Sequence, residues 1–196
     1  MIICCLDLEG VLVPEIWIEV SKKTGIRDLR FTTRDISDYD VLMRRRLKTL
    51  KNENIRLKDI QNVIAKIKPL PGAKAFLDKL RSEHQVAILS DTFEEFAAPL
   101  MKQLGTPTLF CNSLKINAKG FISGYKLRQK NGKEKAVLAL RQIGYEVRAA
   151  GDSYNDITML KAADKGFLFN PPPSFSREFP KFKVTTNYQE LLSALI

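Results

Sequence analysis

The sequence predicts an α/β protein with a parallel central sheet and a small helical segment inserted after the first strand. Short apolar runs, typical of strands buried on both faces, alternate along the chain with segments of helical periodicity. Between the first two such runs, residues 14–70 carry helical signals only. The chain has 196 residues, of which 44% are hydrophobic, so it is long enough for a sizeable core and a small insertion.

The predicted strands are five apolar runs, at residues 2–6, 86–89, 108–111, 147–150 and 166–169. Residues 93–104 place apolar side chains at positions i, i+3, i+4 and i+7, and residues 133–143, 154–163 and 188–195 also favour helix. Residues 121–127 alternate and carry Gly124, which predicts a hairpin. Parallel sheets of this kind bind their ligands at the carboxyl ends of the strands.

Residues 14–70 are expected to form a helical lid above that edge of the sheet. Pro14 suits the first position of a helix, and Gly25 suits its end. A second helix is expected over residues 38–52 and a third over residues 58–66, before Pro69 and Pro71 break the pattern. The predicted domains are therefore a core of residues 1–13 and 71–196 and a lid of residues 14–70.

Acidic and hydroxyl side chains follow three of the predicted strands. They are Asp7 and Glu9, then Ser90 and Asp91, then the run Gly151-Asp152-Ser153-Tyr154-Asn155-Asp156. Because these strand ends meet at one edge, the carboxylates would repel one another unless a cation lay among them. Oxygen ligands without histidine or cysteine indicate Mg²⁺, and hydroxyl groups and helix N-termini beside it suit a phosphate.

Arg46 is the one arginine expected on the inner face of the second lid helix. It lies seven residues after Tyr39, within the apolar stripe of that helix, whereas Arg44 and Arg45 fall outside the stripe. An inward-facing arginine needs an anion. Snorkelling to solvent, or a pair with an acid of the lid, is the alternative.

The formal net charge of +10 does not by itself indicate a nucleic-acid partner. The basic residues are spread along the chain, without a helix-turn-helix, zinc-finger or RNP-like pattern, so we expect attraction for a small anionic substrate instead.

No apolar run approaches the ~20 residues of a membrane span, and the beginning of the chain does not resemble a signal peptide. Three cysteines without a C-x-x-C motif favour the reducing cytoplasm. For the oligomeric state, a homodimer is a guess.

Four motifs in order resemble those of the haloacid dehalogenase superfamily, which implies its Rossmann-like core. They are an Asp followed two residues later by a second acid, a Ser after a strand, a Lys, and a G-D-x-x-N-D run. The Lys is Lys133, with Lys135 as the rival. Because a cation at the start of a helix is unfavourable in the field of the helix dipole, its presence there suggests a functional lysine. Glu9 stands where the superfamily usually has Asp. Glu9 in this position resembles one branch of the superfamily, the bacterial phosphoserine phosphatases that also act as phosphoserine:homoserine phosphotransferases. The same branch is resembled by five stretches of the chain, residues 7–17, 33–36, 38–43, 88–93 and 150–156.

The resemblance implies a Mg²⁺-dependent phosphoserine phosphatase of L-serine biosynthesis. Asp7 would form an aspartyl-phosphate, and Glu9 would act as acid and then base, with a pKa raised by burial under the lid. The implied Mg²⁺ ligands are the Asp7 carboxylate, the Glu9 backbone carbonyl, Asp152 and, directly or through water, Asp156. Homoserine in place of water would give the phosphotransferase, and another small phosphorylated metabolite is the alternative substrate.

The resemblance also implies how the substrate is held. Ser90, the backbone N–H of Asp91, Lys133 and Asn155 would hold the phosphoryl group. Arg46 would bind the substrate carboxylate and Glu15 the substrate ammonium group, although an acid at Glu15 also suits the dipole of a helix start. An arginine and an acid on a lid above a phosphate site together describe a phosphorylated amino acid.

Overall fold

The computed structural model describes residues 1–32, 35–36 and 38–196. Thr33 and Arg34, which belong to one of the stretches that carry the resemblance, lie outside the described residues, as does Ser37.

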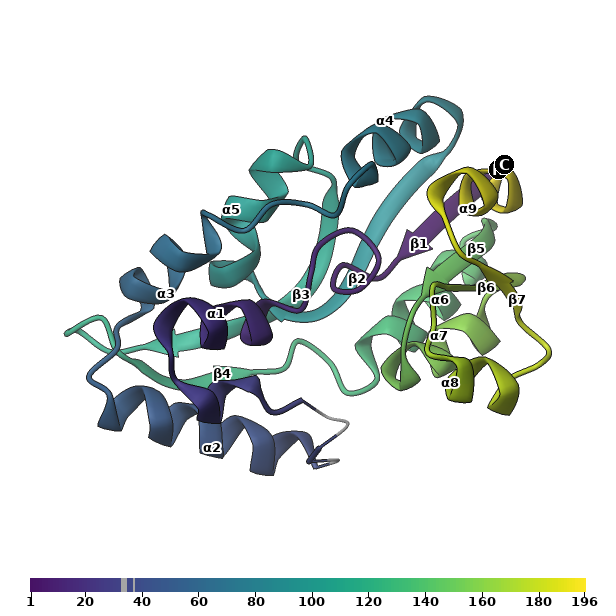
Figure 1. The fold of residues 1–196 in the computed structure, drawn as a ribbon. Helices are drawn as coiled ribbons and strands as arrows, with labels where there is room; N and C mark the ends of the chain where they lie inside the picture. Colours follow the sequence, from purple (N-terminus) through teal and green to yellow (C-terminus); the bar gives the residue numbers. More distant parts are fainter. Residues whose placement is uncertain (33–34, 37) are drawn as a thin grey trace.

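A seven-stranded sheet in the order β4-β3-β2-β1-β5-β6-β7 forms the centre of the fold (Figure 1). The strands are β1 (Ile2–Leu6), β2 (Gln85–Phe93), β3 (Thr108–Ile116), β4 (Ile122–Lys126), β5 (Glu146–Gly151), β6 (Lys165–Phe169) and β7 (Lys183–Thr185). All neighbouring strands are parallel except β3 and β4, which are antiparallel. The predicted parallel α/β sheet is confirmed.

Strand β1 lies between β2 and β5, and its register sets the position of the site. Leu6 is opposite Ile88 of β2 on one side and Ala150 of β5 on the other. The residues that follow these three positions, including Asp7 and Asp152, therefore emerge at the same edge of the sheet.

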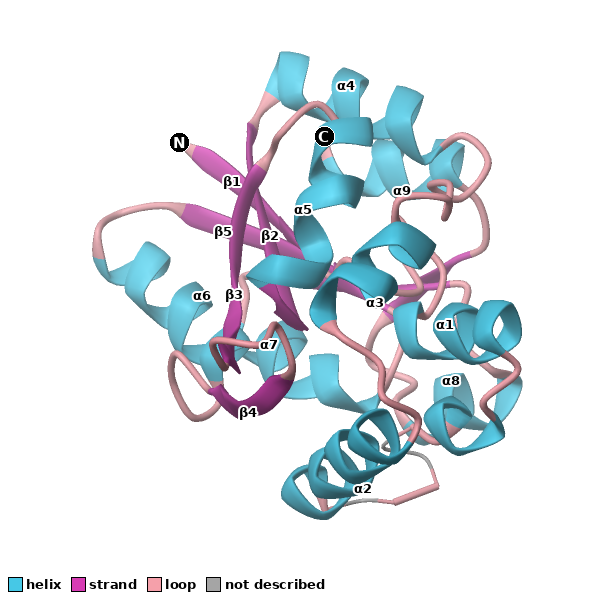
Figure 2. Cartoon of the chain, turned by 90° about the vertical axis from the view of Figure 1, so that its left-hand side faces the viewer, coloured by secondary structure: helices cyan, strands magenta, loops and turns pink. Residues whose placement is uncertain are grey.

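Helices cover both faces of the sheet (Figure 2). They are α4 (Ala73–Glu83), α5 (Glu94–Gln103), α6 (Gly132–Gln142), α7 (Ile157–Ala162), α8 (Pro173–Glu178) and α9 (Tyr188–Leu195), with a 3-10 helix η2 (Tyr154–Asp156) before α7. Cys4 and Leu6 of β1 pack into the apolar cluster that includes Phe96 of α5, while Ile3 and Cys5 pack into a second cluster with α6, α7 and α8. Burial on both faces explains why β1 is apolar without alternation.

The described part of residues 14–70 contains α1 (Ile16–Thr24), the 3-10 helix η1 (Arg27–Arg30), α2 (Tyr39–Asn52) and α3 (Leu57–Ile64). Asp38 accepts a hydrogen bond from the N–H of Val41 and so caps α2, and Gly25, at φ +76°, ends α1 as predicted. The prediction that Pro14 begins the helix is wrong. α1 begins at Ile16, whose N–H donates to the Glu9 carboxylate, because Glu15 has a non-helical ψ of 111° and is the N-cap. Pro14 therefore lies two residues before the helix.

The hairpin predicted over residues 121–127 is confirmed: β3 and β4 form it, with Gly120 at φ +82° in its turn and Gly124 inside β4. One further prediction needs correction. Residues 154–163 form η2 and then α7 instead of one helix.

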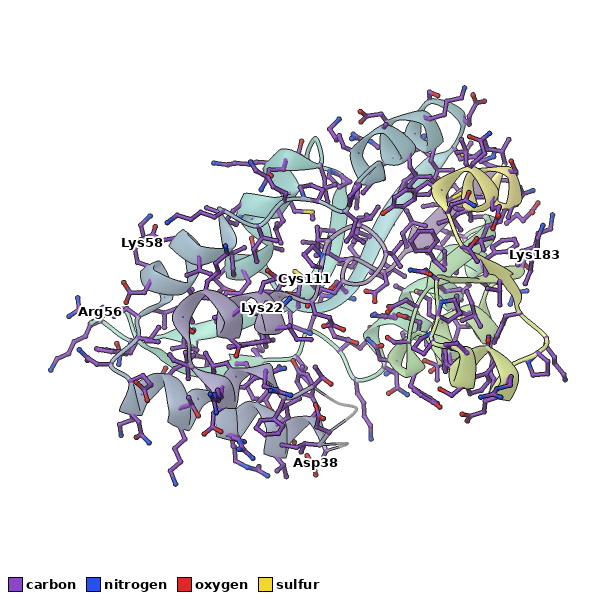
Figure 3. All side chains as sticks on the ribbon, viewed as in Figure 1. Lys22, Asp38, Arg56, Lys58, Cys111 and Lys183 are labelled. Carbon is purple, nitrogen blue, oxygen red and sulfur yellow. The ribbon has the colours of Figure 1, made fainter. Side chains whose placement is uncertain are left out.

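The surface charge is spread, as expected. The exposed Arg56 and Lys58 lie at one end of the molecule and Lys183 at the other (Figure 3). In the described part of the chain, we find no helix with the length and apolar character of a membrane span.

Candidate active site

Three carboxylates meet at the carboxyl edge of the sheet. Asp7 directly follows β1, where its N–H donates to the Ala150 carbonyl at 3.0 Å. Asp7, Asp152 and Asp156 each place a carboxylate oxygen within 4.8 Å of those of the other two. Asp7 is only 4% exposed and Asp156 is fully buried. The structure thus brings together the acids that the sequence placed after β1 and β5.

Two glycines permit this close approach. Gly10 adopts φ +80°, and a Cβ atom there would lie 2.4 Å from the carboxylate of Asp152. A Cβ atom on Gly151 would lie 2.4 Å from the side chain of Asp156. Both loops can pack against the acidic cluster only because these positions lack a side chain.

Lys133 is the cation that the structure places inside this cluster. Its Nζ lies 2.8 Å from Asp7 Oδ1 and 2.7 Å from Asp156 Oδ1, and the side chain is 4% exposed. Although burial lowers the pKa of Lys133, the carboxylates of Asp156, Asp7 and Asp91 raise it well above its usual range, so the lysine is charged. Its rival Lys135 is exposed on the outer side of α6.

Asp156 organises the loop that follows β5. Its Oδ2 accepts hydrogen bonds from the N–H groups of Asp152 and Ser153 at 3.0 and 3.1 Å, while Oδ1 accepts from Lys133. Both oxygens of this buried carboxylate therefore already have donors.

The electrostatics of Asp7 favour a cation at this place. Burial and the neighbouring Asp156 raise the pKa of Asp7 well above its usual range, and Lys133 opposes the rise. A cation between Asp7 and Asp152 would offset this repulsion. The donor set is made of carboxylate oxygens, which hard divalent cations prefer, so the cluster can hold a metal ion.

The second half of β2, where its pairing with β3 shifts register, borders the cluster, so Ser90 and Asp91 lie within β2 and not after it as predicted. Ser90 is 6% exposed, and its Oγ accepts a hydrogen bond from the N–H of Thr92 at 3.2 Å, which leaves the hydroxyl proton to donate elsewhere. The Asp91 carbonyl accepts from Asn112 Nδ2 at 3.1 Å, and Asn155 Nδ2 donates to Asp91 Oδ2 at 3.2 Å. The predicted residues Ser90, Asp91, Lys133 and Asn155 thus lie together.

Glu9, Glu15 and Arg46 lie on the side of the site formed by α1 and α2. Glu9 Oε2 accepts from the N–H of Ile16 at 2.7 Å. Burial and the neighbouring Glu15 raise the pKa of Glu9 to about 8, whereas that hydrogen bond and Arg46 lower it. The rise agrees with the expectation from the sequence.

Arg46 is buried on the inner face of α2, 6% exposed. Its guanidinium lies over the ring of Trp17, 4.5 Å from the centroid, and Nη2 donates to the Phe31 carbonyl at 2.7 Å. Among the described residues, the buried Nε has no hydrogen-bond partner. One edge of the guanidinium is therefore available to a ligand.

Two residues of the site were not predicted. The side-chain amide of Asn112 in β3 donates a hydrogen bond to the Asp91 carbonyl through Nδ2 and accepts one from the N–H of Arg128 at 3.0 Å through Oδ1. The Tyr39 hydroxyl of α2 lies 3.5 Å from the same carbonyl, and its ring meets Tyr125 edge-on. A strand asparagine carries no sequence signal. Tyr39 belongs to the apolar stripe of its helix, and this position predicts a buried ring but not a contact of the hydroxyl group.

Residues 3–164 match the haloacid dehalogenase-like hydrolase family. The match covers most of the chain and includes all the acids of the cluster, so the chain belongs to this family of enzymes.

The similar curated proteins are phosphoserine phosphatases. The chain is 56% identical over 191 residues to phosphoserine phosphatase ThrH of Pseudomonas aeruginosa, covering 97% of this chain and 93% of that protein. It is 55% identical to a phosphoserine phosphatase of Pseudomonas syringae pv. tomato, covering 99% and 82%. A phosphoserine phosphatase structure in the apo form superposes with a TM-score of 0.80 at 21% identity, covering 99% and 98%, and shows the same fold.

Proposed function

We propose that this chain is a Mg²⁺-dependent phosphoserine phosphatase, which converts O-phospho-L-serine and water into L-serine and phosphate. The observation that carries the proposal is the buried Asp7, held between Lys133 and two further carboxylates. Beside it lie Glu9 in the loop after β1, Glu15 at the N-cap of α1 and Arg46 of α2. The similarity to two phosphoserine phosphatases at more than half identity supports it.

Asp7 is the nucleophile. One of its carboxylate oxygens attacks phosphorus and forms an aspartyl-phosphate, while the bond from phosphorus to the serine oxygen breaks. Glu9 donates a proton to that leaving oxygen. Glu9 then takes a proton from water, whose oxygen attacks the aspartyl-phosphate to give phosphate and restore Asp7.

The Asp7 and Asp152 carboxylates and the backbone carbonyl of Glu9 would hold Mg²⁺. We place Asp156 behind a water molecule, because both of its oxygens already accept hydrogen bonds from Lys133 and from backbone N–H groups. When bound, the ion offsets the repulsion between an anionic nucleophile and an anionic phosphate.

The Ser90 hydroxyl, the Asp91 N–H, the Lys133 ammonium and the Asn155 amide would donate to the phosphoryl oxygens. Because Lys133 already lies 2.8 Å from Asp7, a phosphoryl group bound by it is also positioned for attack by that carboxylate.

Residues 14–70 form the lid in this account, and residues 1–13 and 71–196 form the core. The open edge of the Arg46 guanidinium would bind the substrate carboxylate, and Glu15 would bind its ammonium group. These contacts select a phosphorylated amino acid over a phosphate ester without those groups. We also place the enzyme in the cytoplasm, since all three of its cysteines are free thiols.

A phosphate-release screen tests the proposal. Phosphoserine, phosphothreonine and several sugar phosphates are compared with and without Mg²⁺, and homoserine is added as a second acceptor. We expect Mg²⁺-dependent release from phosphoserine above all others. Preference for a sugar phosphate would favour another metabolite phosphatase, and formation of phosphohomoserine would add the phosphotransferase reaction, which uses the same aspartyl-phosphate.

A further inference from the structure

We propose that the Asp91 side chain competes with the bound phosphoryl group for the same donors, and so weakens the affinity of the site for phosphate. The inference rests on the proposed function only in that the site takes a phosphate group. It concerns the carboxylate of Asp91, whereas the proposed function uses only the backbone N–H of this residue.

The Asp91 carboxylate faces two of the groups that a phosphoryl group needs. Its Oδ2 accepts from Asn155 Nδ2 at 3.2 Å and lies 3.8 Å from Lys133 Nζ. A phosphoryl group bound by Lys133 and Asn155 would bring a second anion to the same place. Two like charges at such distances repel one another, so both cannot keep these contacts.

The carboxylate of Asp91 is the part of this arrangement that can move. Lys133 is 4% exposed and fixed by Asp7 and Asp156, while the Asp91 side chain is 48% exposed. Asn112 Nδ2 holds the Asp91 carbonyl, which keeps the backbone in place. Phosphate binding therefore turns the side chain outwards to solvent and leaves the backbone N–H in position.

The consequence is a site that holds every phosphate ligand less tightly. Any phosphate ligand must first displace the Asp91 carboxylate from Asn155 and Lys133, and this cost weakens the binding of substrate and of product phosphate alike. A uniform loss of ground-state binding does not slow the chemical step, and it favours release of the product phosphate.

Isothermal titration calorimetry with inorganic phosphate tests the inference on the full chain in the presence of Mg²⁺. Asp91→Asn removes the charge and keeps the shape of the side chain, and we expect it to lower the Kd of phosphate about fivefold. Asp91→Glu keeps a carboxylate and should bind as weakly as the wild type. Glu94→Gln, an exposed acid at the start of α5, is the matched control for a general change in charge and should leave the Kd unchanged.

Unchanged or weaker phosphate binding by Asp91→Asn would overturn the inference, as would an equal gain in Glu94→Gln. A variant with a damaged site does not bind more tightly, so a gain in affinity separates competition from a structural role. A wild type that binds phosphate but does not hydrolyse phosphoserine would remove the proposed function and leave this inference standing.

Discussion

Replacing Arg46 by Ala should selectively impair the hydrolysis of phosphoserine. The guanidinium is buried on the inner face of α2, over the Trp17 ring, and within the described part of the chain its one hydrogen bond shorter than 3 Å is to the Phe31 carbonyl. Its Nη1 has only a 3.8 Å contact with Met43 Sδ, and Nε has no partner among the described residues. Two donors are thus available to a substrate carboxylate.

The size of the effect follows from these two donors. Each hydrogen bond between charged groups contributes about 1.5–3 kcal/mol. Truncating one partner of a buried charge pair typically costs about 2–5 kcal/mol, and we expect a loss of transition-state binding in this range. It corresponds to a fall in kcat/KM for phosphoserine of about 30-fold to a few thousandfold.

The assay compares kcat/KM for phosphoserine and for p-nitrophenyl phosphate, which has no carboxylate, in wild type and Arg46→Ala. In the variant, kcat/KM for p-nitrophenyl phosphate should fall far less than kcat/KM for phosphoserine. Arg45→Ala is the control on the same helix, because Arg45 is exposed and pairs with Asp28 on the surface. Circular dichroism shows whether each variant is folded.

An equal fall of both rates in Arg46→Ala would refute the reasoning. The arginine would then be structural or would serve the phosphate, and phosphoserine would lose the contact that distinguishes it from other phosphate esters.

Three further predictions concern the lid, the metal and the loop after β1. Glu15→Gln should also lower kcat/KM for phosphoserine more than for p-nitrophenyl phosphate, since only phosphoserine carries an ammonium group. EDTA should stop phosphate release, Mg²⁺ should restore it, and excess Ca²⁺ should inhibit, because Ca²⁺ takes more ligands at longer distances; full activity in metal-free buffer would contradict the carboxylate site. Gly10→Ala should abolish turnover, because its Cβ would lie 2.4 Å from Asp152; Gly25→Ala, equally left-handed but with no atom within 4 Å, should cost about 1 kcal/mol of unfolding free energy in a denaturant titration and keep activity. Similar turnover in the two glycine variants would contradict the role of close approach.

The sequence predicted the centre of the fold because its signals there are local. β1 is buried on both faces, so its residues form an apolar run without alternation. Asp7 and Asp152 follow strands that pair in parallel with one register, which is why their meeting could be expected. Asp38 caps α2 through its side chain and Gly25 ends α1 through its left-handed backbone, and both act within a few residues along the chain.

Other features depend on contacts between distant segments and left no local signal. β7 has three residues and, in the described sheet, is an edge strand beside β6, so it needs no apolar run. The first N–H of α1, that of Ile16, donates to Glu9 seven residues earlier, and Glu15 rather than Pro14 precedes the helix. Asn112 reaches Asp91 only because β3 pairs with β2 beyond a shift of register.

The central claim is that Asp7 carries the phosphoryl group. Its most direct test is rapid acid quenching of the enzyme with radiolabelled phosphoserine and Mg²⁺, followed by mass spectrometry of the labelled peptide. The account predicts an acid-stable, alkali-labile phosphoryl group on Asp7 that forms within the first turnover and is absent from Asp7→Asn. Label on another residue, or hydrolysis that continues at the wild-type rate in Asp7→Asn with deamidation excluded, would contradict it.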